Sequence, residues 1–166
     1  MKRISLLFVC MGNICRSPLA EGIFDHVVGA TGLSNAFRID SAGLGGWHQG
    51  ELPDPRSIAT ASAHGIDITG QRARKILPED FDGFDLILAM DRSNVVELRR
   101  RSPHADNIHL FGDFALGTGE DIPDPCYGGP EDFELVYARL LAGCNTLVER
   151  LGVISGSWSG KTSSVR

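Results

Sequence analysis

The chain has 166 residues, enough for one domain with a sizeable hydrophobic core. Apolar residues make up 42% of the composition, which excludes a disordered chain and a membrane-embedded one. The formal net charge of −5 at pH 7 gives no overall basic surface of the kind that binds nucleic acid, so an anion site must be built locally.

The first residues predict a buried β-strand. The start "MKRISLLFVCMG" imitates a secretory signal peptide, but its apolar run is short and no clean small-residue cleavage site follows. Residues 4–9 are mostly apolar and rich in β-formers, which is typical of a buried parallel strand. We therefore expect a cytoplasmic protein with no segment inserted in a membrane.

A helix is expected after the loop over residues 10–16. Ser17 can cap this helix with Pro18 at its first position, and apolar residues then recur at helical spacing from Leu19 to Val28. Strand, tight loop and amphipathic helix together form the opening of a βα unit.

The middle of the chain alternates in the same way. Strands are predicted at residues 37–41, 84–91 and 107–111. One helix is expected to begin at Asp54 and end at Gly65, and Asp91 can cap another.

Toward the end, residues 112–129 are predicted to be a loop because glycine, proline and acidic residues punctuate them. Pro130 then opens a long helix with an apolar stripe. We expect residues 1–152 to form one domain and the serine- and glycine-rich residues 153–166 to be a flexible tail, with Trp158 as its one anchor candidate.

This order of elements predicts the fold class. Strands that alternate with helices indicate an α/β protein, here a doubly wound four-stranded parallel sheet with helices on both faces. Ligands of such folds bind beyond the carboxyl ends of the strands. The loop after the first strand therefore lies where a site is expected.

That loop carries groups that suit a tetrahedral anion. Backbone N–H groups at a helix start point at a bound anion, and Gly12 leaves their approach open. Asn13 tolerates a left-handed backbone, and Arg16 can donate two parallel hydrogen bonds to an oxyanion. The same positive field favours a thiolate, the nucleophilic form of cysteine, at Cys10. The spacing predicts a nucleophile and an oxyanion clamp in one phosphate-binding loop.

Plainer interpretations of the cysteines remain open. Cys10 could simply be buried near a helix start, with Arg16 in a surface ion pair. The other cysteines are Cys15, Cys126 and Cys144, and the chain is not a small, cysteine-dense secreted framework. The spacing of Cys10 and Cys15 does not match a zinc site, so we expect no metal. Cys144 lies on the apolar stripe of the last helix, where core packing is its expected role.

Several motifs resemble one family. The residues "VCMGNICRSPLAE" are similar to the phosphate loop of the low-molecular-weight protein tyrosine phosphatases. The motifs "DSAG", a tryptophan followed by "PDPR", "HGI", "DLILAMD" and "DPCYGG" follow in that family's order. The resemblance covers about residues 4–151. It implies a phosphatase without a cofactor, which acts on tyrosine-phosphorylated proteins, a tyrosine kinase among the candidates. We expect a monomer.

The resemblance also implies roles for individual residues. Cys10 attacks phosphorus and forms a phosphocysteine, and Arg16 binds the equatorial oxygens of the transition state. Ser17 hydrogen-bonds the nucleophile, while Asn13 holds the strained shape of the loop with support from Ser41.

The general acid implied by the resemblance is Asp124, the aspartate of an Asp-Pro pair in the late loop. The same carboxylate would activate water for the second step. From the residues alone, Asp113, Glu120 and Asp121 are rivals, and a solvated acidic loop explains Asp113 and Glu120 better.

Substrate choice is expected to come from the walls of the site. Trp47 and Tyr127 match aromatic residues that flank a phenyl ring in the family, although Trp47 could instead pack on the core. The expected substrate-binding residues of the loop itself are Met11, Gly12, Asn13, Ile14, Cys15 and Ser17.

Departures from the family pattern keep alternatives open. Cys126 stands where the family often has a tyrosine, which removes one aromatic wall. Ile14 replaces the threonine of arginine phosphatases of this fold, which favours phosphotyrosine over phosphoarginine. Arsenate reductases share the loop and use late cysteines, so Cys126 and Cys144 keep that activity as an alternative. A catalytically silent phosphotyrosine-binding module is a further one.

Cys15 is also a candidate for redox regulation. In the family, a neighbouring cysteine in the loop can form a protective disulfide with the nucleophile. The hypothesis is that peroxide inactivates the enzyme reversibly through a bond between Cys10 and Cys15.

Overall fold

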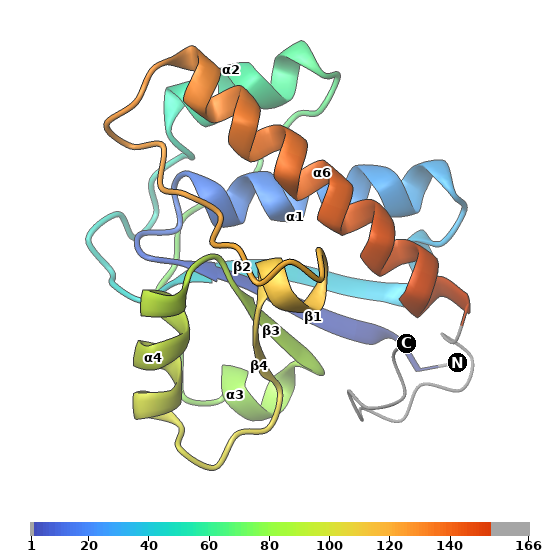
Figure 1. Ribbon diagram of the computed structural model, residues 1–166, viewed down its shortest axis with the longest axis vertical. Helices are drawn as coiled ribbons and strands as arrows, with labels where there is room; N and C mark the ends of the chain where they lie inside the picture. The colour runs from blue at the N-terminus through green and yellow to red at the C-terminus, as the bar shows by residue number, and fades with distance from the viewer. Residues whose placement is uncertain (1, 154–166) are drawn as a thin grey trace.

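A parallel four-stranded sheet forms the centre of the molecule in the computed structural model, which describes residues 2–153. The strands are β1 (Ile4–Cys10), β2 (Phe37–Gly43), β3 (Leu86–Ala89) and β4 (Ile108–Leu110). Their order across the sheet is β2-β1-β3-β4 (Figure 1). All three pairings are parallel, and the predicted α/β fold is confirmed.

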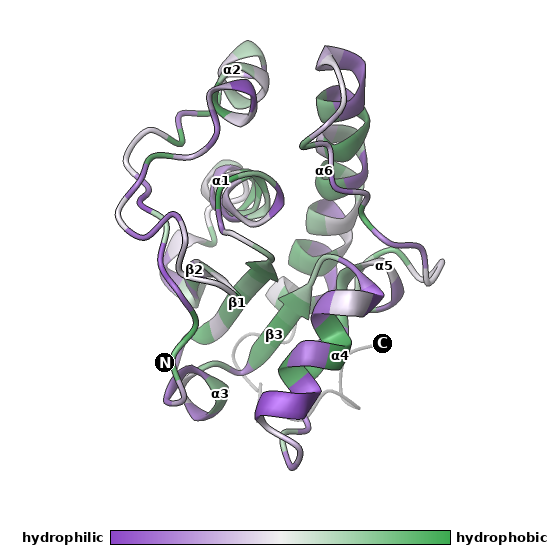
Figure 2. Ribbon diagram, turned by 90° about the vertical axis from the view of Figure 1, so that its left-hand side faces the viewer, coloured by the Kyte–Doolittle hydropathy of each residue, from purple (hydrophilic) through white to green (hydrophobic). Residues whose placement is uncertain are grey.

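Helices cover both faces of this sheet (Figure 1). On one face lie α1 (Arg16–Ala30), α2 (Pro55–Ala63) and the long α6 (Pro130–Val153). The other face is covered by α3 (Asp80–Gly83) and α4 (Arg92–Arg101). Two short elements complete the order, the 3-10 helix η1 (Ser34–Ala36) and the single-turn helix α5 (Phe111–Phe114). Figure 2 shows apolar segments concentrated in the strands, between the two helical layers.

The alternation of side chains along β1 explains why this strand must be central. Ile4, Leu6 and Phe8 belong to the core beneath α1 and α6, whereas Leu7 and Val9 belong to the core beneath α3 and α4. All seven residues of β1 are buried and all but Ser5 are apolar, so the strand buries both faces, as parallel sheets require. Cys10 is the next residue on the α1 side, and it lies at the carboxyl end of the strand.

The strand order also places the loop over residues 10–16. The chain runs from β1 to β2 on one side and then returns to β3 on the other. The carboxyl ends of β1 and β3 therefore flank the point where the direction of winding reverses, which is the usual ligand crevice of a doubly wound sheet.

Some predicted boundaries differ from the structure. β2 continues past Ser41 to Gly43, because Ala42 and Gly43 pair with Val9 and Cys10. A side chain on Gly43 would place its Cβ 2.9 Å from the Gly12 carbonyl carbon, so glycine permits the close approach of β2 to the loop.

The prediction of an uninterrupted loop over residues 112–129 is wrong at its start. Phe111–Phe114 form α5, because Phe111 is fully buried and its ring centroid lies 6.3 Å from that of Phe8. β3 is also shorter than the predicted strand over residues 84–91.

Other expectations are confirmed. Asp54 caps α2 by accepting a hydrogen bond from the Arg56 backbone N–H, and the helix ends just before Gly65, which has φ +78°. Asp91 caps α4. The predicted tail with Trp158 lies outside the described residues, apart from Val153 at the end of α6. Within the described residues, no helix has the length and apolar character to span a membrane.

Candidate active site

The loop over residues 10–16 is held open by Asn13. This residue has φ +59°, the left-handed conformation expected from the sequence. Its Oδ1 accepts a hydrogen bond of 3.0 Å from the backbone N–H of Arg74. Its Nδ2 donates to the hydroxyl oxygens of Ser17 at 2.8 Å and Ser41 at 3.0 Å. The side chain thus ties the loop to α1, β2 and the segment before α3.

Ser17 does not cap α1, so the sequence-based prediction of its local role is wrong. The helix begins at Arg16, and its N-cap residue Cys15 makes no side-chain capping bond. The Ser17 hydroxyl instead lies 3.0 Å from the Cys10 sulfur. Because its oxygen already accepts from Asn13, its proton is available for that sulfur. The hydroxyl therefore serves the candidate nucleophile, which explains the missing cap.

Arg16 is buried, with 3% of its surface exposed, so a surface ion pair is excluded for it. Its Nη1 donates to Asp91 Oδ2 at 2.7 Å and to the Ile122 carbonyl at 2.9 Å. These bonds use both hydrogens of Nη1 and leave Nε and Nη2 for a ligand. Burial works to lower the pKa of Arg16, but the charge of Cys10 and the contact with Asp91 raise it above its ordinary value.

Asp91 is a site residue that the sequence pattern identified only as a helix cap. Its Oδ1 accepts the Asn94 backbone N–H at 2.8 Å at the start of α4, while Oδ2 holds Arg16. The available signal was its place directly after a buried strand, because the carboxyl ends of neighbouring parallel strands meet at one edge. Asp91 thus couples the start of α4 to the Arg16 guanidinium.

A cavity of about 130 Å³ lies above the loop, and we name it the phosphate pocket. Cys10 lies in its lining with only 3% of its surface exposed. The pocket brings together most of the predicted site residues: Cys10, Met11, Gly12, Ile14, Cys15, Arg16, Trp47 and Asp124. Cys126 and His48 complete the lining. Among residues 2–153, no group of three or more His, Cys, Asp or Glu is placed to hold a metal ion.

Asp124 is the acidic residue of the late loop that reaches this pocket. Its Oδ2 lies 3.8 Å from Arg16 Nη2, and its Oδ1 accepts the Cys126 backbone N–H at 3.0 Å. Half of its side chain is exposed, as proton exchange with water requires. The rivals lie elsewhere, since Asp121 pairs with Arg92 at 3.2 Å and Glu120 with Arg139 at 3.6 Å.

The two aromatic residues expected as walls behave differently. Trp47 does not pack on the core, because 68% of its surface is exposed. Its ring lies over Gly45, where a Cβ would come within 2.0 Å of a ring carbon, so a bare backbone supports the indole. Tyr127 is fully exposed and does not line the phosphate pocket, whereas its neighbour Cys126 does.

His48 is a pocket residue that the sequence did not single out. A Cβ added to Gly12 would lie 3.1 Å from the His48 ring, so the imidazole covers the loop closely. Its Nδ1 lies 3.3 Å from Glu51. A lone histidine in a glycine-rich loop carries no signal by itself.

Cys15 lies beside Cys10 as an uncharged thiol. It is buried, and the pKa of Cys15 is raised to about 12 by that burial and by the nearby Asp54 carboxylate. All four cysteines of the described chain are free. Cys144 is fully buried in the core, where burial raises its pKa. Its expected role in core packing is confirmed.

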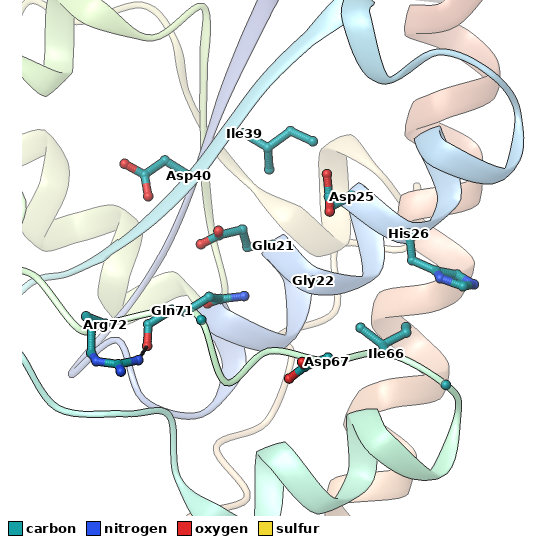
Figure 3. A pocket seen from close by; sticks show the side chains of 12 residues that line it. Glu21, Gly22, Asp25, His26, Ile39, Asp40, Ile66, Asp67, Gln71 and Arg72 are labelled. Atoms are coloured by element: carbon teal, nitrogen blue, oxygen red, sulfur yellow. Dashed lines mark hydrogen bonds between the residues drawn. The ribbon is translucent and has the colours of Figure 1, made fainter.

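Ser41 connects the loop to a carboxyl group on α1. Because its oxygen accepts from Asn13, its proton must go to Glu21 Oε1, which lies at 2.6 Å. Glu21 faces a separate hollow of about 560 Å³, and Figure 3 shows Asp25 and Asp40 around the same hollow. Burial raises the pKa of Glu21 to about 7, with the charge of Asp40 adding to this effect and the Ser41 hydrogen bond opposing it.

Glu21 is therefore expected to make stability depend on pH. Its folded-state pKa exceeds the ordinary value of 4.5, so the folded chain binds more protons than the unfolded chain between about pH 4.5 and 7. The free energy of unfolding should fall as pH rises through this window. Glu21→Gln, which can still accept the Ser41 proton, should raise that free energy by about 3 kcal/mol at pH 8 and little at pH 4. Urea unfolding at a series of pH values across this range measures the free energy. If that free energy falls with pH as steeply in the variant as in the unchanged protein, the prediction is contradicted.

Comparisons with known proteins agree with this geometry. The model of the family described as low molecular weight phosphotyrosine protein phosphatase matches residues 5–153. The relative of that name from Sus scrofa is 41% identical over 151 residues, covering 89% of this chain and 95% of the relative.

Solved structures give the same result. The crystal structure of YfkJ from Bacillus subtilis matches with a TM-score of 0.86 and 37% identity, covering 92% of this chain and 97% of the other. The crystal structure of DARP, a Drosophila arginine phosphatase, matches with a TM-score of 0.79 and 35% identity over 87% of this chain and 95% of that one. On fold, motif and sequence, the chain belongs to the low molecular weight phosphotyrosine protein phosphatase family.

Proposed function

We propose that this protein tyrosine phosphatase hydrolyses its substrates in two steps, with Cys10 as the nucleophile. The observation that carries the proposal is the position of Cys10 in the lining of the phosphate pocket, 3.0 Å from the Ser17 hydroxyl. Arg16 lines the same pocket with Nε and Nη2 left for a ligand. A nucleophile, an oxyanion clamp and an acid around one small cavity suit phosphoryl transfer.

In the first step, the Cys10 sulfur attacks phosphorus and the bond to the phenolic oxygen breaks. Arg16 donates from Nε and Nη2 to two non-bridging oxygens, where charge is spread in the transition state. Asp124 gives its proton to the leaving phenolate. Its place beside Arg16 Nη2 puts this carboxyl near the transferred group.

In the second step, the Asp124 carboxylate takes a proton from water as the water oxygen attacks phosphorus. The bond between phosphorus and sulfur breaks, and inorganic phosphate leaves. The Ser17 hydroxyl donates to the thiolate that forms, and this bond lowers the energy of the departing sulfur. Asn13 supports that geometry because it holds the Ser17 oxygen.

Phosphotyrosine is the substrate class that this pocket suits. Cys10 is almost fully buried, so a substrate must carry its phosphate on a long, flat arm. Trp47 offers an aromatic face at the rim. The Drosophila relative named an arginine phosphatase makes phosphoarginine the rival. Ile14 lines the pocket with a hydrocarbon side chain, which offers a guanidinium no hydrogen bond.

Asp124→Asn is expected to separate the acid from the nucleophile. On phosphotyrosine, whose leaving group needs a proton, kcat should fall by about 10²–10³-fold. On 2,4-dinitrophenyl phosphate, whose phenolate leaves unaided, the first step should be nearly unchanged. Rapid-quench release of the phenol measures this, with Asp121→Asn as the matched control. Equal losses on both substrates would refute the acid role of Asp124.

We also propose that peroxide inactivates the enzyme reversibly through Cys10 and Cys15. Peroxide converts the Cys10 thiolate to a sulfenic acid, and the Cys15 thiol then displaces water to form a disulfide. An external dithiol reduces that bond and restores the nucleophile. Both residues line the phosphate pocket, which supports the pairing.

Cys15→Ser should make this inactivation irreversible. After peroxide treatment, the unchanged protein is expected to regain most of its activity with dithiothreitol, and the variant little, since sulfenic acid oxidises further without a partner thiol. Cys126→Ser is the matched control, because Cys126 is the third thiol of the pocket. If Cys126→Ser rather than Cys15→Ser loses recovery, the pairing is with Cys126.

The remaining expectations concern cellular context. We propose a cytoplasmic, monomeric enzyme whose substrates are tyrosine-phosphorylated proteins, a tyrosine kinase among them. The free state of the cysteines is what a reducing compartment favours. Burial of Cys144 in the core speaks against an arsenate-reducing relay through that residue. The joint presence of Cys10, Arg16 and Asp124 in the pocket speaks against a silent binding module.

A further inference from the structure

Two adjoining hollows extend from the phosphate pocket along α4. The phosphate pocket shares Met11 and Trp47 with an open hollow of about 680 Å³. That hollow shares Lys75 and Arg101 with another of about 710 Å³, which reaches the C-terminal end of α4. We name these two adjoining hollows the α4 groove. Because neighbouring cavities share lining residues, the groove is continuous with the pocket that holds Cys10.

The end of the α4 groove nearer the pocket is apolar. Met11, Trp47 and Val96 line it, with 43%, 68% and 69% of their surfaces exposed. Val96 lies on α4, a helix in which five of the ten residues are charged. Three large apolar side chains exposed in one hollow beside a catalytic pocket are typical of a binding surface.

The far end of the groove carries an excess of positive charge. Arg100 and Arg101 both donate to Glu97, at 2.6 Å and 2.7 Å, and hydrogen bonds from Arg100 and Arg101 lower the pKa of Glu97 to about 2. One carboxylate thus faces two arginines. The exposed Lys75 adds a further cation, and no described residue pairs with its ammonium group. This cluster stands out on a chain whose formal net charge is −5.

The phosphate pocket itself carries acidic side chains. Asp124 lines it and Glu51 lies 3.3 Å from His48 in its lining, whereas neither carboxylate lines the two hollows of the α4 groove. A negatively charged segment would be repelled there and attracted along the α4 groove. The charge pattern therefore gives the groove a preferred occupant.

We propose that the α4 groove binds the stretch of a phosphoprotein next to its phosphotyrosine, and selects an apolar residue followed, farther from the phosphotyrosine, by acidic residues. The apolar side chain lies against Met11, Trp47 and Val96, and the acidic side chains lie near Lys75. This inference rests on the proposed phosphotyrosine phosphatase function and names the substrate class for it. Groove residues outside the phosphate pocket set KM for peptides, whereas the chemical step is left to the pocket.

Matched phosphotyrosine peptides test the proposal. One pair carries leucine and then glutamates, or leucine and then lysines, after the phosphotyrosine, and a second pair carries the same residues before it. Phosphate release gives kcat/KM for each peptide. In at least one of the two pairs, kcat/KM of the unchanged protein should be about fivefold higher for the glutamate peptide than for the lysine peptide. Addition of 1 M salt should reduce that preference.

Lys75→Glu should abolish or reverse this preference, while Lys2→Glu, a change of the same charge at the start of the chain, should keep it. Val96→Ser should remove the advantage of leucine over serine next to the phosphotyrosine, and Leu135→Ser on α6 is its control. Persistence of the acidic preference in Lys75→Glu, or its loss in Lys2→Glu as well, would overturn the proposal.

Hydrolysis of p-nitrophenyl phosphate distinguishes failure of the proposed phosphatase function from failure of the groove proposal. If the unchanged protein does not cleave this small substrate, the proposed function fails, whatever the peptides show. If it cleaves the substrate but all peptides agree within twofold, only the groove proposal is overturned. If the activity per molecule of protein on the small substrate falls as the protein concentration rises, a second copy of the chain occupies the groove. That result would also overturn the groove proposal.

Discussion

Cys10→Ser is expected to remove hydrolysis of p-nitrophenyl phosphate, lowering kcat by about 10⁴-fold or more. The Cys10 sulfur is the atom that forms the covalent bond in the proposed mechanism, and a serine hydroxyl is far less nucleophilic than a thiolate. Steady-state hydrolysis at saturating substrate measures the loss. A fall of less than about tenfold would rule out Cys10 as the nucleophile.

Two controls keep this result interpretable. Cys126→Ser removes another thiol of the same pocket and should retain activity within a few-fold. Cys10→Ser should still bind inorganic phosphate, because Arg16 and the backbone of the loop remain. Loss of both activity and phosphate binding would indicate a collapsed loop and not a missing nucleophile.

Arg16→Lys is expected to lower kcat for aryl phosphates by about 10²–10³-fold. The guanidinium divides its hydrogens between two tasks, since Nη1 serves Asp91 and the Ile122 carbonyl while Nε and Nη2 remain for the substrate. A lysine ammonium presents a single nitrogen and cannot do both. Charge is conserved in this variant, so the loss measures the fork geometry alone.

The matched control for Arg16→Lys is Arg92→Lys. Arg92 is the first residue of α4, and its exposed side chain pairs with Asp121. This substitution should leave kcat within about twofold, because exposed ion pairs contribute little. If Arg16→Lys retains kcat and raises only KM, the arginine holds the substrate without stabilising the transition state.

The parts of the fold that could be predicted are those set by local pattern. Residues 4–9 are apolar except for Ser5, which predicts a buried central strand, and β1 is that strand. Asp54 before Pro55 predicts a capped helix start from short-range chemistry, and α2 begins there. The helical stripe after Pro130 likewise becomes α6.

The features that could not be predicted depend on tertiary contacts. Arg16 and Asp91 are 75 positions apart, and only the adjacency of β1 and β3 brings them to 2.7 Å. Ser17 has the local chemistry of a helix cap, but its hydroxyl accepts a hydrogen bond from Asn13 and contacts the Cys10 sulfur instead of the helix backbone. The unusual protonation of Glu21 follows from burial, which no local sequence pattern reports.

The site itself could be predicted further than its surroundings. The spacing of Cys10 and Arg16 around a strand-to-helix loop already indicated anion chemistry, and the phosphate pocket contains both. The walls were less predictable, because exposed side chains such as Tyr127 are not constrained by the core. Peptide selectivity therefore has to be sought in surface charge, as in the α4 groove.

The most direct test of the two-step mechanism is capture of the covalent intermediate. Asp124→Asn is mixed with 2,4-dinitrophenyl phosphate, so that the first step needs no acid and the second lacks its base. The protein is denatured in alkali during turnover, digested and mapped by mass spectrometry. The account predicts one added phosphoryl group on the peptide containing Cys10. A burst of phenol with no phosphoryl group on Cys10, or with the group on another residue such as His48, would contradict it.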